Sequence, residues 1–533
     1  MQRPNFLIFI TDQHRADHLG CYGNPVVRSP HIDALARHGA RFDKAYVANP
    51  VCMPNRGSIM TARMPSAHGA RSNGIALPLE SVTFADLLAE SGYHTALIGK
   101  SHLQTMEDKP PLLAPTVLPP GTQPSTHYRE ARRDTAPAAR YEQELRSRWD
   151  DPQHSMQLPY YGFQDVILCN HHADECFGDW LRWLQAEHPE QAARIGRAHG
   201  ARDPRYSAPQ AWQTTLDENA YPTHYIAQQT AHWIRDHVAQ RGEQPFAVMC
   251  SFPDPHHPWT PPGRYWDMYD PAAMEVPESM RRGQADAQHV RWLMDERRDG
   301  KANLEGPRLF AANAREVQEM IALTYGMITN IDDRVGMVMD ALRASGADRN
   351  TVVVFTADHG DLMGDHGIVL KGPLHYQSLV RVPLIWREPP ADGAVTPTVR
   401  DDLASSIDLP ATILRRAGIA PVNGMQGKPL FSTTGAPTPT ARTSVLIEEN
   451  QQRAYLGFEQ PVQVRTLVTA SHRMSVFVEG GWGELYDLQA DPHEMDNLWE
   501  RPEHAPLKLQ LMQELAQQMM AMSDASPRPT RIA

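Results

Sequence analysis

Short apolar runs alternate with helix-like patterns along most of the chain. Four runs rich in aliphatic and aromatic residues predict buried strands at 6–11, 95–98, 246–252 and 351–356. Apolar positions three or four residues apart predict helices at 31–38, 84–90, 223–239, 316–344 and 403–417. This alternation is typical of an α/β fold, and we predict a large, mixed, mostly parallel sheet flanked by helices.

The pattern changes in two places, and these changes indicate how the chain is divided. Residues 104–160 are rich in Pro, Arg and Gln and lack periodicity, which predicts a surface insertion that acts as a lid or an oligomer contact. After residue 421 the chain shows strand-like runs at 444–448, 462–468 and 474–478 and a last helix at 507–522. At 533 residues the chain is long for one core. We predict a catalytic domain at 1–420 and a small α+β subdomain with an antiparallel sheet at 421–533.

Composition narrows the possible partners and the location. The net charge of −12 and the pI of about 6.1 argue against binding to nucleic acid or to anionic membranes. No apolar window approaches the ~18 residues of a membrane span. The apolar run at 5–10 is too short for a signal peptide, and no small-residue cleavage site follows it, so we expect a cytoplasmic protein. Five irregularly spaced cysteines do not suggest a disulfide framework.

The most informative motif is the run CMPNRGSIMTAR at 52–63. The spacing of its thiol, proline and arginine, just before a short helical pattern, places Cys52 at a helix N-terminus beside Arg56. Backbone N–H groups and a guanidinium would both stabilise an anion there. A five-residue pattern recurs by chance, so the motif gains weight only from the rest of the chain.

Two acidic motifs follow predicted strands. Asp12 and Gln13 come directly after the first strand, and Asp358 and His359 come after the strand at 351–356. Ligands gather at the carboxyl ends of strands in open α/β sheets, so these residues are well placed for a metal ion. In isolation the Asp-His-Gly run reads as an ordinary turn.

Three basic motifs complete the pattern. They are GKSHL at 99–103 with Lys100 and His102, PDPHHP at 253–258 with His256, and LKGP at 370–373 with Lys371. Each has a plain alternative as a solvated turn or a Pro-rich loop. His375 is expected either to contact substrate or to pack locally. Residues 169–176 hold two cysteines and two histidines, which either line the substrate pocket or belong to the core, and their spacing fits zinc poorly.

Taken in their order along the chain, from Asn5 to about Leu498, the motifs resemble the sulfatase family of the alkaline phosphatase superfamily, in which the cysteine is oxidised to formylglycine. The resemblance implies an alkaline-phosphatase-like fold. It implies one divalent cation held by Asp12, Gln13, Asp358, His359 and the modified Cys52. It also implies roles for the remaining motif residues: Arg56, Lys100 and Lys371 hold the sulfate, His256 is the general acid, and His102 acts as base when the intermediate collapses.

The chemistry of sulfate esters explains why such residues are needed together. Anionic oxygens shield the sulfur, so attack requires charge neutralisation by the cation and the basic side chains. A hydrated aldehyde offers two hydroxyls on one carbon. One attacks sulfur and the other expels sulfate, which regenerates the aldehyde.

Several alternatives stay open at this point. Gln13 and His359 depart from the commonest family pattern and resemble phosphonate monoester hydrolases and choline sulfatases. Ca²⁺ prefers oxygen ligands and Mn²⁺ accepts mixed oxygen and nitrogen, so both ions are candidates. We expect hydrolysis of a small sulfate ester, an aryl sulfate, by a homo-oligomer matured by a formylglycine-generating enzyme. The alternatives are a phosphonate monoester or phosphodiester hydrolase, a choline sulfatase, and a non-catalytic binding protein in which Cys52 stays a thiol.

Overall fold

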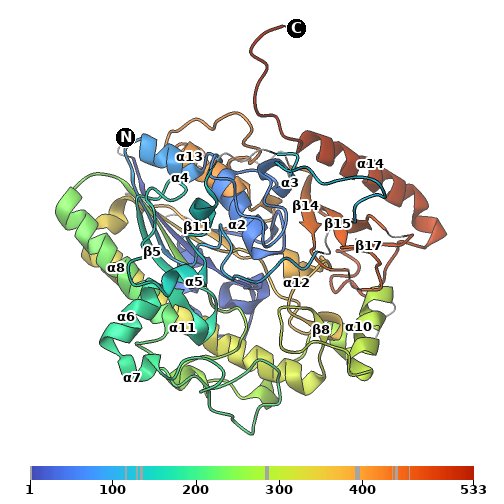
Figure 1. Ribbon diagram of the computed structural model, residues 1–533, viewed down its shortest axis with the longest axis horizontal. Helices are drawn as coiled ribbons and strands as arrows, with labels where there is room; N and C mark the ends of the chain where they lie inside the picture. Colours follow the sequence, from blue (N-terminus) through green and yellow to red (C-terminus); the bar gives the residue numbers. More distant parts are fainter. Residues whose placement is uncertain are drawn as a thin grey trace.

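Nine strands of the described chain form one large sheet (Figure 1). The computed structural model describes residues 3–532 except 114–116, 128–129, 133–135, 283–286, 391–396, 435, 439–441, 455 and 480. The strand order is β12 (Thr398–Arg400), β2 (Ala40–Phe42), β11 (Leu384–Arg387), β9 (Thr351–Ala357), β1 (Asn5–Thr11), β7 (Phe246–Phe252), β4 (His94–Gly99), β5 (Asp165–Asn170) and β6 (Phe177–Gly178). The central five, from β9 to β5, are parallel, and β11 and β6 run antiparallel at their sides. The mixed, mostly parallel sheet predicted from the sequence is therefore confirmed.

Helices cover both faces of this sheet (Figure 1). One face packs against α8 (Pro222–Arg241), α11 (Ala314–Ala344) and α1 (Pro30–Arg37), and the other against α2 (Cys52–Thr61), α4 (Phe84–Glu90) and α13 (Asp408–Arg416). Along β1, Leu7 and Phe9 enter the first core, whereas Phe6 and Ile8 enter the second. Burial on both faces explains why such strands appear in the sequence as unbroken apolar runs.

The predicted elements lie close to those observed. All four predicted strands form, with ends that differ by at most one residue, and α4 has the predicted bounds. The helix predicted at 403–417 begins only at Asp408, because β13 (Ala404–Ser405) occupies its first turn. The sequence did not predict β5 or the short edge strands.

The other described α-helices and strands before residue 420 are short. The helices are α3 (Pro65–His68), α5 (Arg146–Trp149), α6 (Asp179–Glu187), α7 (Pro189–Ala192), α9 (Glu278–Arg281), α10 (Gln288–Arg298) and α12 (Gln377–Val380). The strands are β3 (Ala45–Tyr46), which pairs with β13, and β8 (Phe310–Ala311), which pairs with β10 (Ile368–Val369). Among the described helices, none is long and apolar enough to cross a membrane.

A separate antiparallel sheet lies near the C-terminus, at the right of Figure 1. Its strands are β14 (Ser444–Asn450), β15 (Gln463–Thr469), β16 (His472–Phe477) and β17 (Gly483–Asp487), and α14 (Ala505–Ala521) packs on the first two. Val445 and Ile447 of β14 share a core cluster with Leu374 and Val380 of the preceding region. The small sheet is therefore packed directly against the segment that contains Lys371.

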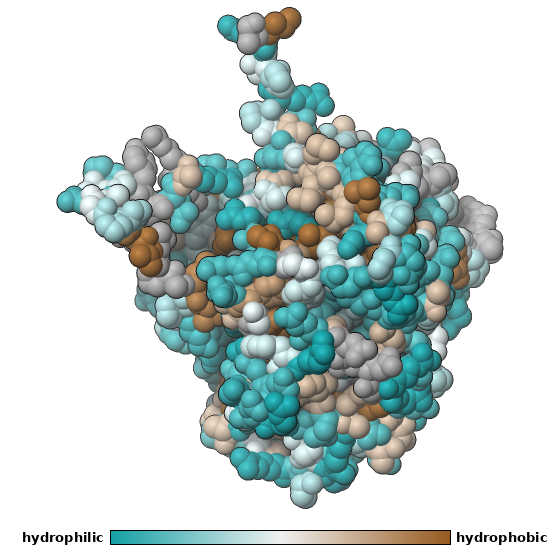
Figure 2. All heavy atoms as spheres, turned by 90° about the vertical axis from the view of Figure 1, so that its right-hand side faces the viewer, coloured by the Kyte–Doolittle hydropathy of each residue, from teal (hydrophilic) through white to brown (hydrophobic). Residues whose placement is uncertain are grey.

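The surface on the side of this C-terminal region is mostly hydrophilic, with apolar residues scattered between (Figure 2). On α14, Leu509 and Met520 are exposed. Scattered apolar residues of this kind are normal on protein surfaces and identify no partner.

The segment at 104–160 has two different parts. In its described portions, residues 107–140 are almost entirely exposed, in keeping with their polar composition. The chain then turns inward, and Gln143, Glu144 and Trp149 are buried. The second part thus belongs to the interior of the molecule, directly beside the loop that follows β4.

Candidate active site

The two acidic motifs meet because their strands are neighbours. Strands β1 and β9 pair in parallel with Thr11 opposite Ala357, so Asp12 and Asp358 leave the same edge of the sheet. The Asp358 amide donates to the Thr11 carbonyl at 3.0 Å, and the Gln13 amide donates to Asp358 Oδ1 at 3.2 Å. Both carboxylates are fully buried. The register of the sheet therefore brings the two carboxylates to the same edge.

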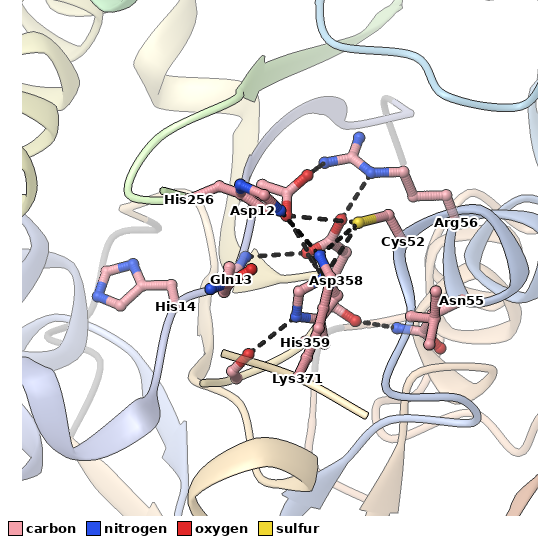
Figure 3. A network of polar contacts seen from close by, with 12 residues as sticks. Asp12, Gln13, His14, Cys52, Asn55, Arg56, His256, Asp358, His359 and Lys371 are labelled. Carbon is pink, nitrogen blue, oxygen red and sulfur yellow. Dashed lines mark hydrogen bonds and ion pairs between the residues drawn. The ribbon is translucent and has the colours of Figure 1, made fainter. Parts of the chain in front are cut away.

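The first residue of α2 brings a thiol to this edge. Cys52 Sγ lies 3.6 Å from Asp12 Oδ1, 3.2 Å from His359 Nε2 and 3.0 Å from the Lys371 ammonium (Figure 3). Burial and Asp12 oppose ionisation of the thiol, but Lys371 and His359 lower the pKa of Cys52 below its ordinary value. The residue at position 52 thus lies in an electropositive pocket at a helix N-terminus, a setting that activates nucleophiles.

Four side chains could hold a metal ion together. One ligand atom from each of Asp12, Cys52, Asp358 and His359 lies within 4.8 Å of the others, and all four residues are buried. Burial opposes ionisation of Asp12, but Lys100 and His256 keep its pKa well below the usual range. Carboxylate oxygens with one imidazole nitrogen fit a divalent cation that accepts both donor types.

The side-chain oxygen of Gln13 is also placed to bind a cation. Its side-chain nitrogen lies 3.1 Å from His257 Nδ1 and donates to Asp361, which fixes the amide. Its Oε1 atom is buried and has no hydrogen-bond partner among the described residues. An unpaired buried oxygen is costly, and a bound cation would satisfy it.

Arg56 holds parts of the site together. Its Nε donates to Asp358 Oδ2 at 2.7 Å, and its Nη1 donates to the Lys100 carbonyl and to Ser251 Oγ, both at 3.0 Å. The Nη2 atom is buried without a hydrogen bond and lies 3.7 Å from Asp12 Oδ2. Arg56 therefore ties the end of β9 to the loop after β4 and keeps one free donor group inside the site.

Two buried lysines face the same region. The Lys100 ammonium donates to Asp12 Oδ2 and lies 2.7 Å from His172 Nε2. The Lys371 ammonium lies 2.9 Å from His256 Nε2 and 3.0 Å from His359 Nε2. Both predicted lysines and His256 are thus brought next to the predicted cation ligands.

The position of His102 supports its predicted role less strongly than the positions of the two lysines support theirs. It lies in the loop after β4 with a left-handed backbone (φ 57°), and its ring Nδ1 is buried without a partner. Among the described residues, no hydrogen bond joins this ring to Cys52. Its role as base therefore stays a prediction.

A carboxylate from the 104–160 segment anchors this loop. Glu144 accepts hydrogen bonds from the backbone N–H groups of residues 102–104 at 2.8 to 3.2 Å, from Asn170 Nδ2 at 2.6 Å, and from the Tyr160 hydroxyl. Burial raises the pKa of Glu144, yet all five partners are donors, which an ionised carboxylate satisfies. No pattern in the sequence marked Glu144.

The C-terminal sheet holds the segment around Lys371. His375 is buried between Thr466 Oγ1 and Glu449 Oε2, and its ring nitrogens lie 2.8 Å from each. It therefore packs locally, which was one of the two roles expected for it. The side chain of Asn49, which lies shortly before Cys52 in the chain, donates to the backbone carbonyl of Glu448 in the same strand, β14. One strand of the small sheet thus contacts both the nucleophile segment and the lysine segment.

Three further polar residues lie near the chemistry: His172 belongs to the run expected to line the pocket or the core, and Asn55 and His257 were assigned no role. His172 contacts Lys100, Asn55 donates to the Asp358 carbonyl, and His257 contacts Gln13. Asn55 lies within the 52–63 motif and His257 is adjacent to His256, so position alone could have suggested both. His172 follows a strand that was not predicted.

A buried thiol at a helix N-terminus, facing two strand-end carboxylates and two lysines, defines a hydrolase site for anionic esters on an alkaline-phosphatase-like fold. The sulfatase family model matches residues 4–419, and a model of the C-terminal region of N-sulphoglucosamine sulphohydrolase matches residues 364–521. The chain therefore belongs to the sulfatase family.

Similar proteins span nearly the whole chain. An arylsulfatase of Clostridium perfringens is 27% identical over 93% of this chain and 90% of its own length. The uncharacterized sulfatase YidJ of Escherichia coli is 26% identical over 93% of this chain and 83% of its own length. The crystal structure of a phosphonate monoester hydrolase of Agrobacterium radiobacter superposes with a TM-score of 0.74, at 21% identity over 100% of this chain and 98% of that one. This structural likeness supports the fold.

Proposed function

We propose that this chain hydrolyses a small sulfate monoester, an aryl sulfate, with one divalent cation (Ca²⁺ or Mn²⁺) and with Cys52 converted to formylglycine. One observation carries the proposal: the side chain of residue 52 contacts Lys371, His359 and Asp12, so the nucleophile position faces both the lysine and the candidate cation ligands. Membership of the sulfatase family supports sulfate ester hydrolysis. The similarity to an arylsulfatase supports the choice of ester.

The charges around residue 52 suit an anionic ester. Arg56, Lys100 and Lys371 face the carboxylates of Asp12 and Asp358, so the basic side chains outnumber the acidic ones even before a cation is added. A bound divalent cation would supply Lewis-acid polarisation of a sulfate oxygen. Formylglycine in its hydrated form would supply a hydroxyl nucleophile. The two ammonium groups bind the remaining oxygens and neutralise the charge that shields the sulfur.

His256 is the group that we assign to the leaving oxygen. Its Nδ1 contacts the backbone carbonyl of His257, which leaves Nε2 directed at Lys371. The Lys371 ammonium donates to Nε2, so the ring is neutral in the free enzyme, and burial together with His172 and Lys371 keeps the pKa of His256 well below its usual range. An anionic ester beside Lys371 offsets this repulsion and favours the protonated form. We assign the proton acceptor for sulfate release to His102.

The decisive experiment combines mass spectrometry with a kinetic panel. Conversion of Cys52 to formylglycine lowers the mass of the peptide that contains it by about 18 Da. We expect the converted enzyme, with Ca²⁺ or Mn²⁺ added, to turn over 4-nitrophenyl sulfate faster than a phenylphosphonate monoester or choline sulfate. The Cys52→Ala variant should lose this activity, and the His256→Ala variant should lose activity most strongly on phenyl sulfate, whose leaving group needs protonation. Full aryl sulfatase turnover by both variants would refute the mechanism, and an unconverted thiol without activity would favour the non-catalytic alternative.

A phosphonate monoester or phosphodiester hydrolase is the second candidate. It is favoured by Gln13 and His359, whose mixed donor set departs from an all-carboxylate site. Faster turnover of the phosphonate ester in the same panel would select it, and faster turnover of choline sulfate would select a choline sulfatase. A cytoplasmic homo-oligomer matured by a formylglycine-generating enzyme remains our expectation from the sequence.

A further inference from the structure

One imidazole of the 169–176 run, which was expected to line the pocket or the core, lies inside the site. His172 lies two residues beyond the end of β5, and β5 pairs in parallel with β4, which ends just before Lys100. The same rule that gathers Asp12 and Asp358 at the carboxyl edge of the sheet therefore brings His172 beside Lys100.

His172 makes two contacts with groups of the proposed mechanism. Its Nε2 lies 2.7 Å from the Lys100 ammonium. Its ring stacks on the His256 ring, with centroids 3.6 Å apart and planes 12° apart. On its other side the His256 ring lies 4.1 Å from that of His257, so His256 is enclosed between two imidazoles.

The first contact fixes the protonation of His172. An ammonium group can only donate, so Nε2 accepts from Lys100 and the ring proton is on Nδ1. His172 is therefore neutral and presents an uncharged π-face to His256. Such a face accommodates an imidazolium better than a second cation would.

The same contact sets the direction of Lys100. Its ammonium has three N–H groups, of which Asp12 and His172 take two. Among the described residues, no other group accepts a hydrogen bond from the third N–H. That third N–H is free to bind an oxygen of the ester.

A second metal ion is the competing explanation. Asp12, His172 and His256 each offer a ligand atom within 4.8 Å of the others. However, the Lys100 ammonium contacts Asp12 and His172 directly, so a positive charge already lies against two of the three. A divalent ion would have to displace it.

We propose that His172 is a positioning residue of the active site, which directs the Lys100 ammonium through Nε2 and holds His256 for leaving-group protonation through its ring face. The proposal rests on the sulfatase function proposed above. It predicts that the two contacts can be separated, since one uses a lone pair and the other a π-face.

Two variants separate the contacts. His172→Gln keeps an acceptor for Lys100 but removes the ring, and His172→Phe keeps a stacking face but removes the acceptor. We expect His172→Gln to lower kcat for phenyl sulfate, a poor leaving group, by about 10- to 100-fold, and kcat for 4-nitrophenyl sulfate by less than about 5-fold. We expect His172→Phe to raise KM for both esters alike, by about 10-fold, because an anion-binding N–H loses its direction.

Controls make these outcomes specific. His199→Gln replaces an exposed imidazole outside the site with the same residue, so its kinetics should match wild type. Thermal unfolding and the converted fraction at residue 52 are measured for every variant. Equal losses on both esters in both variants would overturn the proposal, as would unchanged kinetics. Two metal ions per wild-type chain and one in both variants would establish the metal site instead.

These measurements also distinguish failure of the proposed role of His172 from failure of the proposed sulfatase function. Aryl sulfatase activity that survives Cys52→Ala refutes the proposed function itself. Activity that depends on Cys52 but shows the wild-type response to leaving group in His172→Gln refutes only the role of His172.

Discussion

The acidic and the basic sides of the site are positioned by different parts of the molecule. Asp12 and Asp358 follow two adjacent central strands, whose parallel register brings them to one edge of the sheet. The lysines depend on anchors further away: the Lys100 loop is held by Glu144, and the Lys371 segment is held by the small C-terminal sheet. The two carboxylates proposed to hold the cation thus leave central strands of the sheet, whereas the lysines proposed to bind the substrate anion are held by segments distant in sequence.

This comparison predicts that damage to the acidic side is the most severe. Asp12→Asn removes a charge that faces both Cys52 and Lys100. We expect kcat/KM for 4-nitrophenyl sulfate to fall by about 10³-fold or more and bound metal to fall with it. Steady-state kinetics and elemental analysis of dialysed protein measure both. Asp340→Asn, on an exposed position of α11, is the control. A variant that keeps its metal would place the cation elsewhere.

Removing the charge of a site lysine should lower activity without loss of bound metal. Lys371→Met keeps the length of the side chain and removes the charge beside Cys52 and His256. We expect kcat/KM to fall by about 10²- to 10³-fold with unchanged metal content. Lys428→Met, on the surface, should leave both unaffected. Loss of metal in Lys371→Met would show that the two sides are not independent.

Damage to an anchor should be milder than damage to the lysine it helps to place. Glu144→Gln replaces an acceptor that serves the backbone of residues 102–104. One oxygen becomes a donor that faces other donors, so we expect kcat to fall by about 10- to 100-fold together with a lower Tm. Glu142→Gln, two residues away and partly exposed, is the matched control. Wild-type kinetics in Glu144→Gln would remove the 104–160 segment from the mechanism.

The smallest effect is expected at the anchor of the C-terminal sheet. Glu449→Gln replaces the carboxylate that contacts His375, four residues beyond Lys371. We expect about a 5-fold increase in KM and a loss of roughly 1–3 kcal/mol of stability. Kinetics and urea unfolding test both, with exposed Glu459→Gln as control. A fall in kcat as large as that of Lys371→Met would mean that the small sheet is part of the catalytic machinery.

The same division explains what the sequence could predict. Strands β1 and β9 are buried on both faces, so their apolar runs are continuous and place the acidic residues that follow them at strand ends. Strand β5 begins with Asp165 and its first half is only partly buried, so its pattern is weak. His172, just beyond it, was consequently not assigned to the strand edge.

The anchors could not be predicted for a different physical reason. Glu144 lies about 40 residues from the backbone groups that it binds, in a segment without periodicity. Its local sequence resembles that of any exposed polar stretch. The packing of β14 against the Lys371 segment likewise depends on contacts between distant parts of the chain. A single sequence carries no signal for such contacts.

All ten residues of α2, from Cys52 to Thr61, are buried. The formylglycine-generating enzyme expected from the sequence would have no access to Cys52 once the chain has folded. The proposed maturation therefore competes in time with folding, and a chain that folds first keeps its thiol permanently. Purified preparations would then be fixed mixtures whose active fraction is set during biosynthesis, and slower synthesis or more abundant maturation enzyme should raise it.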